Sequence, residues 1–319
     1  GMHHIGGQYV NFFNGDDKWA PDAFAKVAAF LDAHPEIDAV CCRSSSFGSQ
    51  EGFDHPLDEN FRKERVVDIR KEPACVQPEL EPVWIRSEAL EGRAFDVRLE
   101  SGSGFLFLNR LLLEKGTCGI LPEAVYERRR SLSGLLLTDP NCAMVRSWYT
   151  DMLQHVLSSL TAFSKKTWAK VIPYVQNLVM YEIQWRLKKK TILQTMTEPE
   201  IQEYGKRLKQ LLQEIEDSII WKQKYISYPY KCYAFQLKYG ENPFLTGEVK
   251  DGKLVYRGIP VLNLKAKERV RIHILNVEND RLVIDGETPL AQLGERCRMF
   301  AGDQEGGVWP VKLYPAAYT

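Results

Sequence analysis

Short apolar runs alternate with amphipathic stretches over the first part of the chain. Residues 9–13 (YVNFF) form an aromatic and β-branched run that stops at the polar sequence NGDD, which predicts a buried strand closed by a turn. Residues 21–34 predict a helix, because their apolar positions recur at helical spacing and Pro21 suits a first turn. A strand over residues 37–41 follows. This alternation predicts an α/β fold.

A long polar loop over residues 44–60 follows. The alternation of strands and helices then continues with strands over residues 65–69 and 83–85 and a helix over 105–115. The periodicity then becomes helical near residue 142. Three helices are predicted in this part, over residues 144–162, 167–190 and 199–222.

After Pro229 the pattern changes again, to short strands with hairpin turns at Asp251-Gly252 and Asn279-Asp280. The predicted strands cover residues 232–239, 245–249, 253–257, 269–277 and 281–284. We therefore expect three parts: an α/β domain over residues 1–141, a helical segment over 142–228, and a small C-terminal β-sandwich-like domain over 229–319.

Composition excludes some classes of function. Lys plus Arg and Asp plus Glu both total 42, so no net field attracts nucleic acid. The 7 cysteines include no CxxC pair, which indicates buried thiols in a reducing compartment. Neither a secretory-leader pattern nor an apolar run long enough to cross a bilayer is visible. These features predict a soluble, cytoplasmic protein.

The polar turn after the first strand carries the candidate chemistry. Asp16 and Asp17 leave a strand at a sheet edge where ligands commonly bind. Carboxylate oxygens are hard ligands, so the pair suits Mg²⁺ or Mn²⁺ gripping a diphosphate. The structural alternative is that both side chains cap the following helix or satisfy the turn. A Mg²⁺-dependent phosphohydrolase is a further reading, but the chain lacks the nucleophilic Asp-x-Asp with its downstream lysine.

Several motifs, in one order along most of the chain, resemble the second half of the catalytic domain of family 2 glycosyltransferases, in a bacterial cell-surface branch associated with teichoic acid. The motifs are NGDD with its helix, HPL at residues 55–57, Gln77 with VWIR at 83–86, FD at 95–96, YERRR at 126–130 and YVQNLVMYEIQWR at 174–186. The resemblance implies a partial GT-A-like domain that transfers a sugar from a nucleotide-sugar donor to a cell-surface polymer or a lipid-linked acceptor.

The resemblance also assigns roles to residues of the donor side. Asp16 and Asn14 become the ligands of Mg²⁺ or Mn²⁺, although Asn14 stands where the family usually has Asp and carries no charge. Asp17 becomes a contact to the donor sugar or a further ligand of the metal. Arg128 and Arg130 become contacts to the donor diphosphate, because guanidinium groups suit phosphate oxygens.

The general base is missing from its expected place. An inverting transfer needs a carboxylate that takes the proton of the acceptor hydroxyl. In the resembled family an acidic pair precedes an apolar helix, and here that pair falls on Ser103 and Gly104, neither of which is a base at neutral pH. Glu100 lies three residues upstream and is the candidate substitute.

The beginning of the sequence raises a second difficulty. In the resembled family the nucleotide base is held by strands before the acidic turn, whereas only eight residues precede Tyr9 here. We expect either a fragment or a chain that has lost its nucleotide-binding half. The resulting hypothesis is an impaired glycosyltransferase, and the alternative is a non-catalytic remnant that acts as a binding or scaffold module.

Basic residues gather in the helical segment. Residues 142–192 carry eight basic and two acidic side chains, so their net charge is +6. Such a run is commonly a solvated face, but residues 165–190 also suit peripheral contact with anionic lipid at the inner face of the plasma membrane.

Overall fold

The computed structural model describes residues 5–48, 56–130, 145–189, 196–264, 271–278, 281–287, 299–302 and 307–311. Its backbone contacts divide the chain into two compact units, Gly1–Tyr230 and Lys231–Thr319. The three-part division at residues 141 and 228 stays a prediction. The cysteines within the described ranges are free and buried: Cys41, Cys42, Cys75, Cys118 and Cys232.

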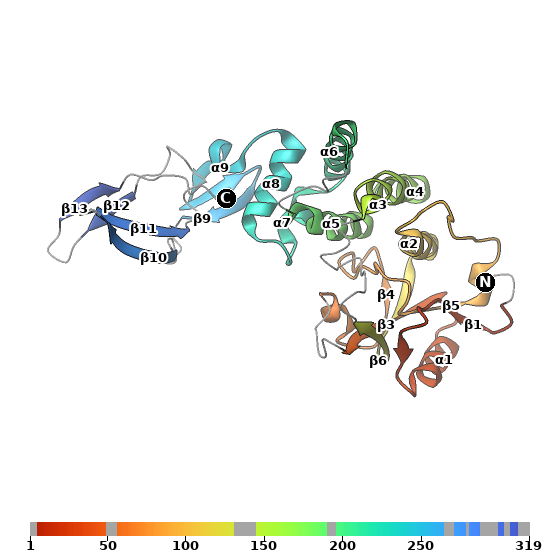
Figure 1. The fold of residues 1–319 in the computed structure, drawn as a ribbon. Helices are drawn as coiled ribbons and strands as arrows, with labels where there is room; N and C mark the ends of the chain where they lie inside the picture. Colours follow the sequence, from red (N-terminus) through yellow and green to blue (C-terminus); the bar gives the residue numbers. More distant parts are fainter. Residues whose placement is uncertain are drawn as a thin grey trace. The chain divides into compact units, whose positions relative to one another are not determined.

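The first unit is built on a mixed six-stranded sheet with the order β1-β5-β3-β6-β2, in which β4 pairs with β6 (Figure 1). The strands are β1 (Tyr9–Asn11), β2 (Lys18–Trp19), β3 (Ala39–Gly48), β4 (Arg65–Asp68), β5 (Val83–Arg86) and β6 (Thr117–Arg130). β3 and β6 are parallel and the other pairs are antiparallel, so the predicted α/β class is confirmed.

The prediction that residues 9–13 form a buried strand is wrong in one respect. β1 lies at an edge of the sheet, its residues are only half-buried, and Phe13 just beyond it is 51% exposed. An apolar, aromatic run predicts a strand, but its burial depends on how many neighbours the sheet provides.

Helices cover both faces of this sheet (Figure 1). Helix α1 (Ala23–Ala33) buries Val27 and Leu31 against Val40 of β3 and Leu121 of β6. Helix α2 (Ser103–Lys115) lies on the opposite face and buries a nearly continuous apolar surface. Both helices were predicted from their periodicity. Two short 3₁₀ turns complete this part, η2 (Asp58–Phe61) and η3 (Ser87–Leu90).

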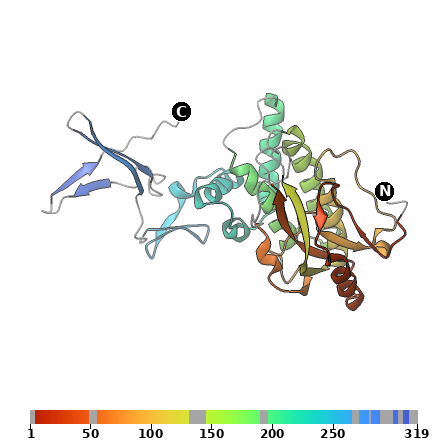
Figure 2. The ribbon, with the colours of Figure 1, turned by 60° about the horizontal axis from the view of Figure 1, so that its bottom comes forward.

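The long strand β6 contains an irregularity that divides it. Figure 2 shows β6 in yellow running beside β3. Cys42 of β3 faces Leu121 and the next residue, Arg43, already faces Val125, so β6 advances four positions while β3 advances one. The three surplus residues form a bulge. The Ala20 amide donates to the Val125 carbonyl at 3.0 Å, which ties the second half of β6 to the loop before α1.

The rest of the first unit is helical, as predicted, but its helices are more broken than the sequence suggests. The segments are α3 (Arg146–Tyr149), a π-helical segment η5 (Met152–Leu157), α4 (Ser158–Trp168), α5 (Pro173–Leu187), α6 (Glu198–Gln213) and α7 (Asp217–Lys222). α5 is buried almost all round, whereas α6 buries only one stripe that includes Leu208, Leu211 and Leu212.

The second unit begins within a helix, which overturns one prediction. Residues 232–239, predicted as a strand, belong to α8 (Tyr228–Tyr239), because Cys232, Phe235 and Lys238 repeat every three residues on its buried side. The other elements are α9 (Pro243–Thr246), β7 (Glu248–Lys250), β8 (Lys253–Tyr256), β9 (Ile259–Asn263), β10 (Arg271–Glu278), β11 (Arg281–Glu287), β12 (Met299–Gly302) and β13 (Val308–Val311). The predicted strand at 245–249 is thus partly helix. β7 to β9 form one sheet, and β10 pairs with β11 and β12 with β13, both antiparallel. The predicted turn at Asn279-Asp280 lies outside the described residues.

Candidate active site

The acidic turn after β1 is fastened to β6 through Asp17. Its Oδ2 accepts a hydrogen bond from the Tyr126 hydroxyl at 2.5 Å, and its Oδ1 accepts one from the Arg129 amide at 2.7 Å. The Asn14 side-chain amide also donates to Oδ2, at 3.3 Å. Burial and the Asp17 carboxylate raise the pKa of Tyr126, so this hydroxyl stays a donor. In this geometry Asp17 holds the turn in place with both of its oxygens.

Asp16 and Asn14 face solvent on the same turn. The Asp16 carboxylate makes no hydrogen bond or ion pair within the described ranges. Asn14 uses its amide nitrogen for Asp17, which leaves its carbonyl oxygen as a donor atom. No group of three or more His, Cys, Asp or Glu among the described residues is arranged to hold a metal. Both groups offer oxygen atoms, the ligand type of Mg²⁺ and Mn²⁺, and such cations often take only one or two protein ligands and complete their shell with substrate phosphates and water. The metal site stays a prediction.

Arg128 is committed to an ion pair inside the protein. Its two terminal nitrogens donate to the Glu79 carboxylate at 2.9 and 3.0 Å, and one of them lies 3.9 Å from Glu81. The Arg128 side chain is 9% exposed and its guanidinium lies 5.8 Å from the Tyr126 ring centre. Arg130 is the last residue of β6, and its side chain lies outside the described part of the structure. The diphosphate role of both arginines stays a prediction.

The residues expected around the general base lie at the start of α2. Ser103 is its first residue, and its hydroxyl donates to the Asp96 carbonyl at 3.2 Å. Gly104 packs tightly, since a Cβ on it would lie 3.3 Å from Leu80 Cδ2. Glu100 is exposed in the preceding loop, and its carboxylate has no hydrogen bond or ion pair in the described ranges. The structure therefore brings Leu80 to Gly104, while Glu100 points to no partner.

Of the loop over residues 77–82 (QPELEP), sequence reasoning named only Gln77 and missed Glu79 and Glu81, the two carboxylates around Arg128. A closed ring of buried polar groups holds the first residue of the loop. The Gln77 backbone amide donates to the Tyr174 hydroxyl at 3.3 Å, and that hydroxyl donates to Asn109 Oδ1 at 2.9 Å. Asn109 Nδ2 in turn donates to the Gln77 backbone carbonyl at 2.9 Å. The sequence signal that could have indicated this loop is a pair of glutamates with one residue between them, flanked by two prolines.

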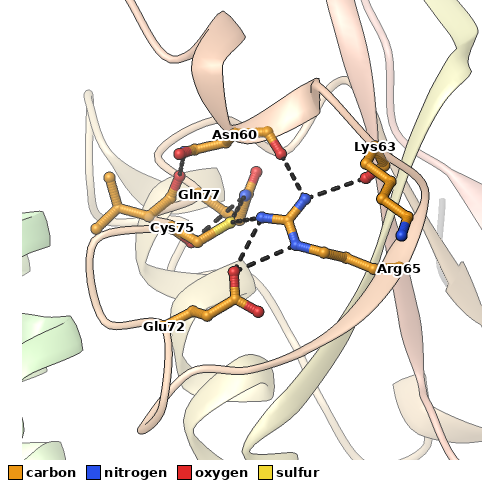
Figure 3. Close-up of polar contacts among 7 residues, drawn as sticks. Asn60, Lys63, Arg65, Glu72, Cys75 and Gln77 are labelled. Atoms are coloured by element: carbon orange, nitrogen blue, oxygen red, sulfur yellow. Dashed lines mark hydrogen bonds and ion pairs between the residues drawn. The ribbon is translucent and has the colours of Figure 1, made fainter.

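A second polar cluster fixes the approach to that loop (Figure 3). The Arg65 guanidinium donates to the Asn60 and Lys63 carbonyls at 2.9 and 3.0 Å, and to Glu72 Oε2 at 3.1 and 3.2 Å. Gln77 contacts the Cys75 carbonyl and thiol from the other side. The segment that leads into residues 77–82 is thus held by side chains at both ends.

The predicted basic surface is smaller than its sequence suggests. Lys165 pairs with Glu214 at 2.7 Å. Arg186 is buried, pairs with Glu182 at 3.3 Å and donates to the Trp148 carbonyl. Lys165 is thus paired at the surface and Arg186 is withdrawn from it, and the membrane contact stays a prediction. Among the described residues, no helix is both long and apolar enough to span a membrane.

Comparison with known proteins supplies relatives but no family model, since none matches the chain. The chain is 26% identical over 291 residues to the Bacillus subtilis minor teichoic acid biosynthesis protein GgaB, covering 90% of this chain and 32% of GgaB. It is 24% identical over 330 residues to GgaA of the same organism, covering 98% of this chain and 71% of GgaA. The chain therefore spans about a third of the length of GgaB.

Solved structures share the fold. The S. aureus TarS 1-349 crystal structure in complex with UDP-GlcNAc has a TM-score of 0.51 at 13% identity, over 79% of this chain and 73% of that one. The TarS complex with UDP gives 0.50 at 15% identity, over 79% and 72%. The resemblance to teichoic-acid-associated glycosyltransferases that the sequence predicts is therefore confirmed, and the chain is a relative of the teichoic acid biosynthesis proteins GgaA and GgaB.

Proposed function

We propose that this chain transfers a glycosyl group from a nucleotide-sugar donor to a teichoic-type acceptor of the cell envelope. The observation that carries the proposal is the similarity to two teichoic acid biosynthesis proteins over 90% and 98% of the chain. The shared fold with a TarS structure that holds UDP-GlcNAc supports a donor of this chemical class. Because such donors are made in the cytoplasm, we place the reaction there.

On the donor side, the proposal uses the acidic turn. Asp16 and the Asn14 carbonyl oxygen would hold Mg²⁺ or Mn²⁺, and Asp17 would keep the turn in register with β6 through Tyr126. A bound cation supplies charge neutralisation for a diphosphate leaving group. Two exposed ligands, one of them uncharged, are a weak cradle, so we expect the donor's own phosphates to contribute most of the metal binding.

On the acceptor side, we expect slow turnover. The Ser103 hydroxyl donates to a backbone carbonyl and Gly104 has no side chain, so the first turn of α2 offers no group able to accept a proton. A positioned base typically contributes about 10²–10⁴-fold in rate.

The alternative is a binding module without catalysis. The observation that favours it is Arg128, whose fork is already used by Glu79 and so is not free for phosphate oxygens. Such a module would bind a teichoic-type polymer and leave the nucleotide-sugar intact.

An assay of UDP release separates the two. The purified chain is incubated with UDP-GlcNAc, Mn²⁺ and poly(glycerol phosphate), next to an Asp16→Ala control. A transferase releases UDP faster than the control and labels the polymer with sugar. Equal release by both proteins at the protein-free rate, together with retention of the polymer in a pull-down, would favour the binding module.

A further inference from the structure

The start of α2 has an acidic neighbour that does not come from α2. Leu80 packs on Gly104, so that a Cβ on Gly104 would lie 3.3 Å from Leu80 Cδ2 and 3.4 Å from Leu80 Cβ. Glu79 and Glu81 flank Leu80 and both turn to Arg128. Leu80 is thus the neighbour of the position at which the expected acidic pair is missing, and the residues on either side of Leu80 in the sequence are glutamates.

The two glutamates differ in their contacts with Arg128 and in their exposure to solvent. Glu79 forms both hydrogen bonds of a bidentate pair with Arg128, and its side chain is 15% exposed. Glu81 lies 3.9 Å from the same guanidinium, beyond hydrogen-bond length, and its side chain is 34% exposed. Glu79 is thus the structural partner, while Glu81 is held near the cation and is accessible to a ligand.

The surroundings of Glu81 suit a proton acceptor. Burial and the neighbouring Glu79 charge raise the pKa of the Glu81 carboxyl, with a smaller contribution from Asp17, while Arg128 opposes the rise. A carboxylate whose pKa is raised is a stronger base than an ordinary one. The loop also holds it firmly, since the Asn11 side chain donates to the Glu81 carbonyl at 2.8 Å.

A buried hydroxyl beside the cluster lacks a hydrogen-bond partner among the described residues. Tyr181 of α5 is 3% exposed, and its hydroxyl has no hydrogen-bond partner in the described part of the chain. Burial raises the pKa of the Tyr181 hydroxyl and the Glu79 charge adds to the rise, while Arg128 opposes it. A buried donor left without a partner is costly, and a hydroxyl group of a ligand would satisfy it.

We propose that Glu81 is the general base of this chain and takes over the role that Ser103 and Gly104 cannot perform. The acceptor hydroxyl gives its proton to the Glu81 carboxylate while its oxygen forms a bond to the anomeric carbon of the nucleotide-sugar. The bond from that carbon to the diphosphate breaks, and the nucleoside diphosphate leaves with the electron pair. Protonated Glu81, partly exposed, returns its proton to solvent. This inference rests on the proposed function and assigns whatever turnover the chain achieves to Glu81.

The test uses the full chain with UDP-GlcNAc, Mn²⁺ and poly(glycerol phosphate), and measures kcat and KM for UDP release. We expect Glu81→Gln to lower kcat by about 10²–10⁴-fold with a donor KM close to that of the unmodified chain. Glu81→Asp retains part of the rate. Glu91→Gln is the matched control, because Glu91 is an exposed glutamate away from the cluster and should leave the rate unchanged.

The pH profile gives a readout that a merely structural role would not move. Since the base acts when deprotonated, the rate should rise with pH through the raised pKa of Glu81 and then level off, and Glu81→Gln should remove that limb. Glu79, Asp17 and Arg128 face the same carboxylate and set the position of the limb. If a thermal melt shows that Glu81→Gln does not fold, the test uses Glu81→Asp. The assignment is then overturned if the rate of Glu81→Asp rises over the same pH range as that of the unmodified chain.

Each remaining outcome also decides a claim. Full turnover in folded Glu81→Gln would overturn the role of Glu81, and a loss confined to Glu100→Gln would move the base to Glu100. Release of UDP by the unmodified chain at no more than the protein-free rate would overturn the proposed function itself, and the role of Glu81 would fall with it.

Discussion

Replacing Arg128 by methionine should unfold the first unit at a markedly lower temperature. The change removes the bidentate partner of Glu79, whose side chain is 15% exposed, and leaves its carboxylate beside that of Glu81. Removing one partner of a mostly buried ion pair costs about 3–5 kcal/mol. At about 2–4 °C per kcal/mol for a unit of this size, the melting temperature should fall by roughly 6–20 °C.

Circular dichroism melts and urea titrations would measure this effect. The matched control is Arg129→Met, because the neighbouring side chain is exposed and its loss should change stability by no more than about 0.5 kcal/mol. The double variant Arg128→Met with Glu79→Met removes both charges of the pair. It should therefore be more stable than Arg128→Met alone.

The reasoning is refuted if Arg128→Met melts like the unmodified chain but loses affinity for UDP-GlcNAc. Arg128 would then serve the donor diphosphate, as the resemblance implies, and the pair with Glu79 would contribute little to the fold. A double variant less stable than Arg128→Met would show that the cost lies in lost packing around the side chain and not in an uncompensated carboxylate.

Three further changes test other parts of the structure. Asp17→Ala should cost about 1–3 kcal/mol in urea titrations, because it removes the acceptor of three donors, while Asp16→Ala at the exposed position should stay within about 0.5 kcal/mol. Gly102→Ala should cost roughly 2–5 kcal/mol, since φ is 79° and a Cβ would lie 2.6 Å from Met152 Sδ; Gly92→Ala, with φ of 69° and open space, should cost only about 1–2 kcal/mol. Calorimetry with UDP and Mn²⁺ should show a Kd no tighter than about 1 mM, or about 4 kcal/mol of binding, and micromolar binding would contradict the weak-cradle argument.

The elements that the sequence predicts correctly are those whose conformation depends least on contacts with distant residues. The helix at residues 105–115 is strongly apolar and ends at Gly116, and the structure has it as α2, with Gly116 in the left-handed conformation after its last turn. The hairpin at Asp251-Gly252 was also predicted correctly, because these two residues favour a tight turn. β7 and β8 pair on either side of that turn.

The failures occurred where tertiary contacts choose between two readings. Residues 232–239 combine aromatic content typical of a strand with a three-residue repeat of buried positions, and packing selected the helix. The run at residues 9–13 was right as a strand, but its place at the sheet edge depends on the pairing of β5 with β3 rather than on its own sequence.

The candidate site was predictable in its residue types and not in its partners. Asp17 was visible as a site residue, yet its bond to Tyr126 joins positions 109 apart in sequence, which no local pattern reports. No local pattern marks Glu79 and Glu81 as partners of Arg128, because the fold brings these residues together from distant parts of the chain.

The bulge in β6 has a consequence for how this protein tolerates changes in length. The three surplus residues, at positions 122–124, lie outside the pairing with β3, which resumes at Arg43 and Val125. Tyr126 and Arg128 take their faces from this resumed pairing, so a one-residue deletion within 122–124 should shorten the bulge and leave both side chains directed at Asp17 and Glu79. A one-residue deletion within the paired stretch 125–127 should instead shift the register and turn Arg128 to the opposite face, because side chains alternate along a strand. The bulge thus absorbs changes in length that the paired part of β6 does not.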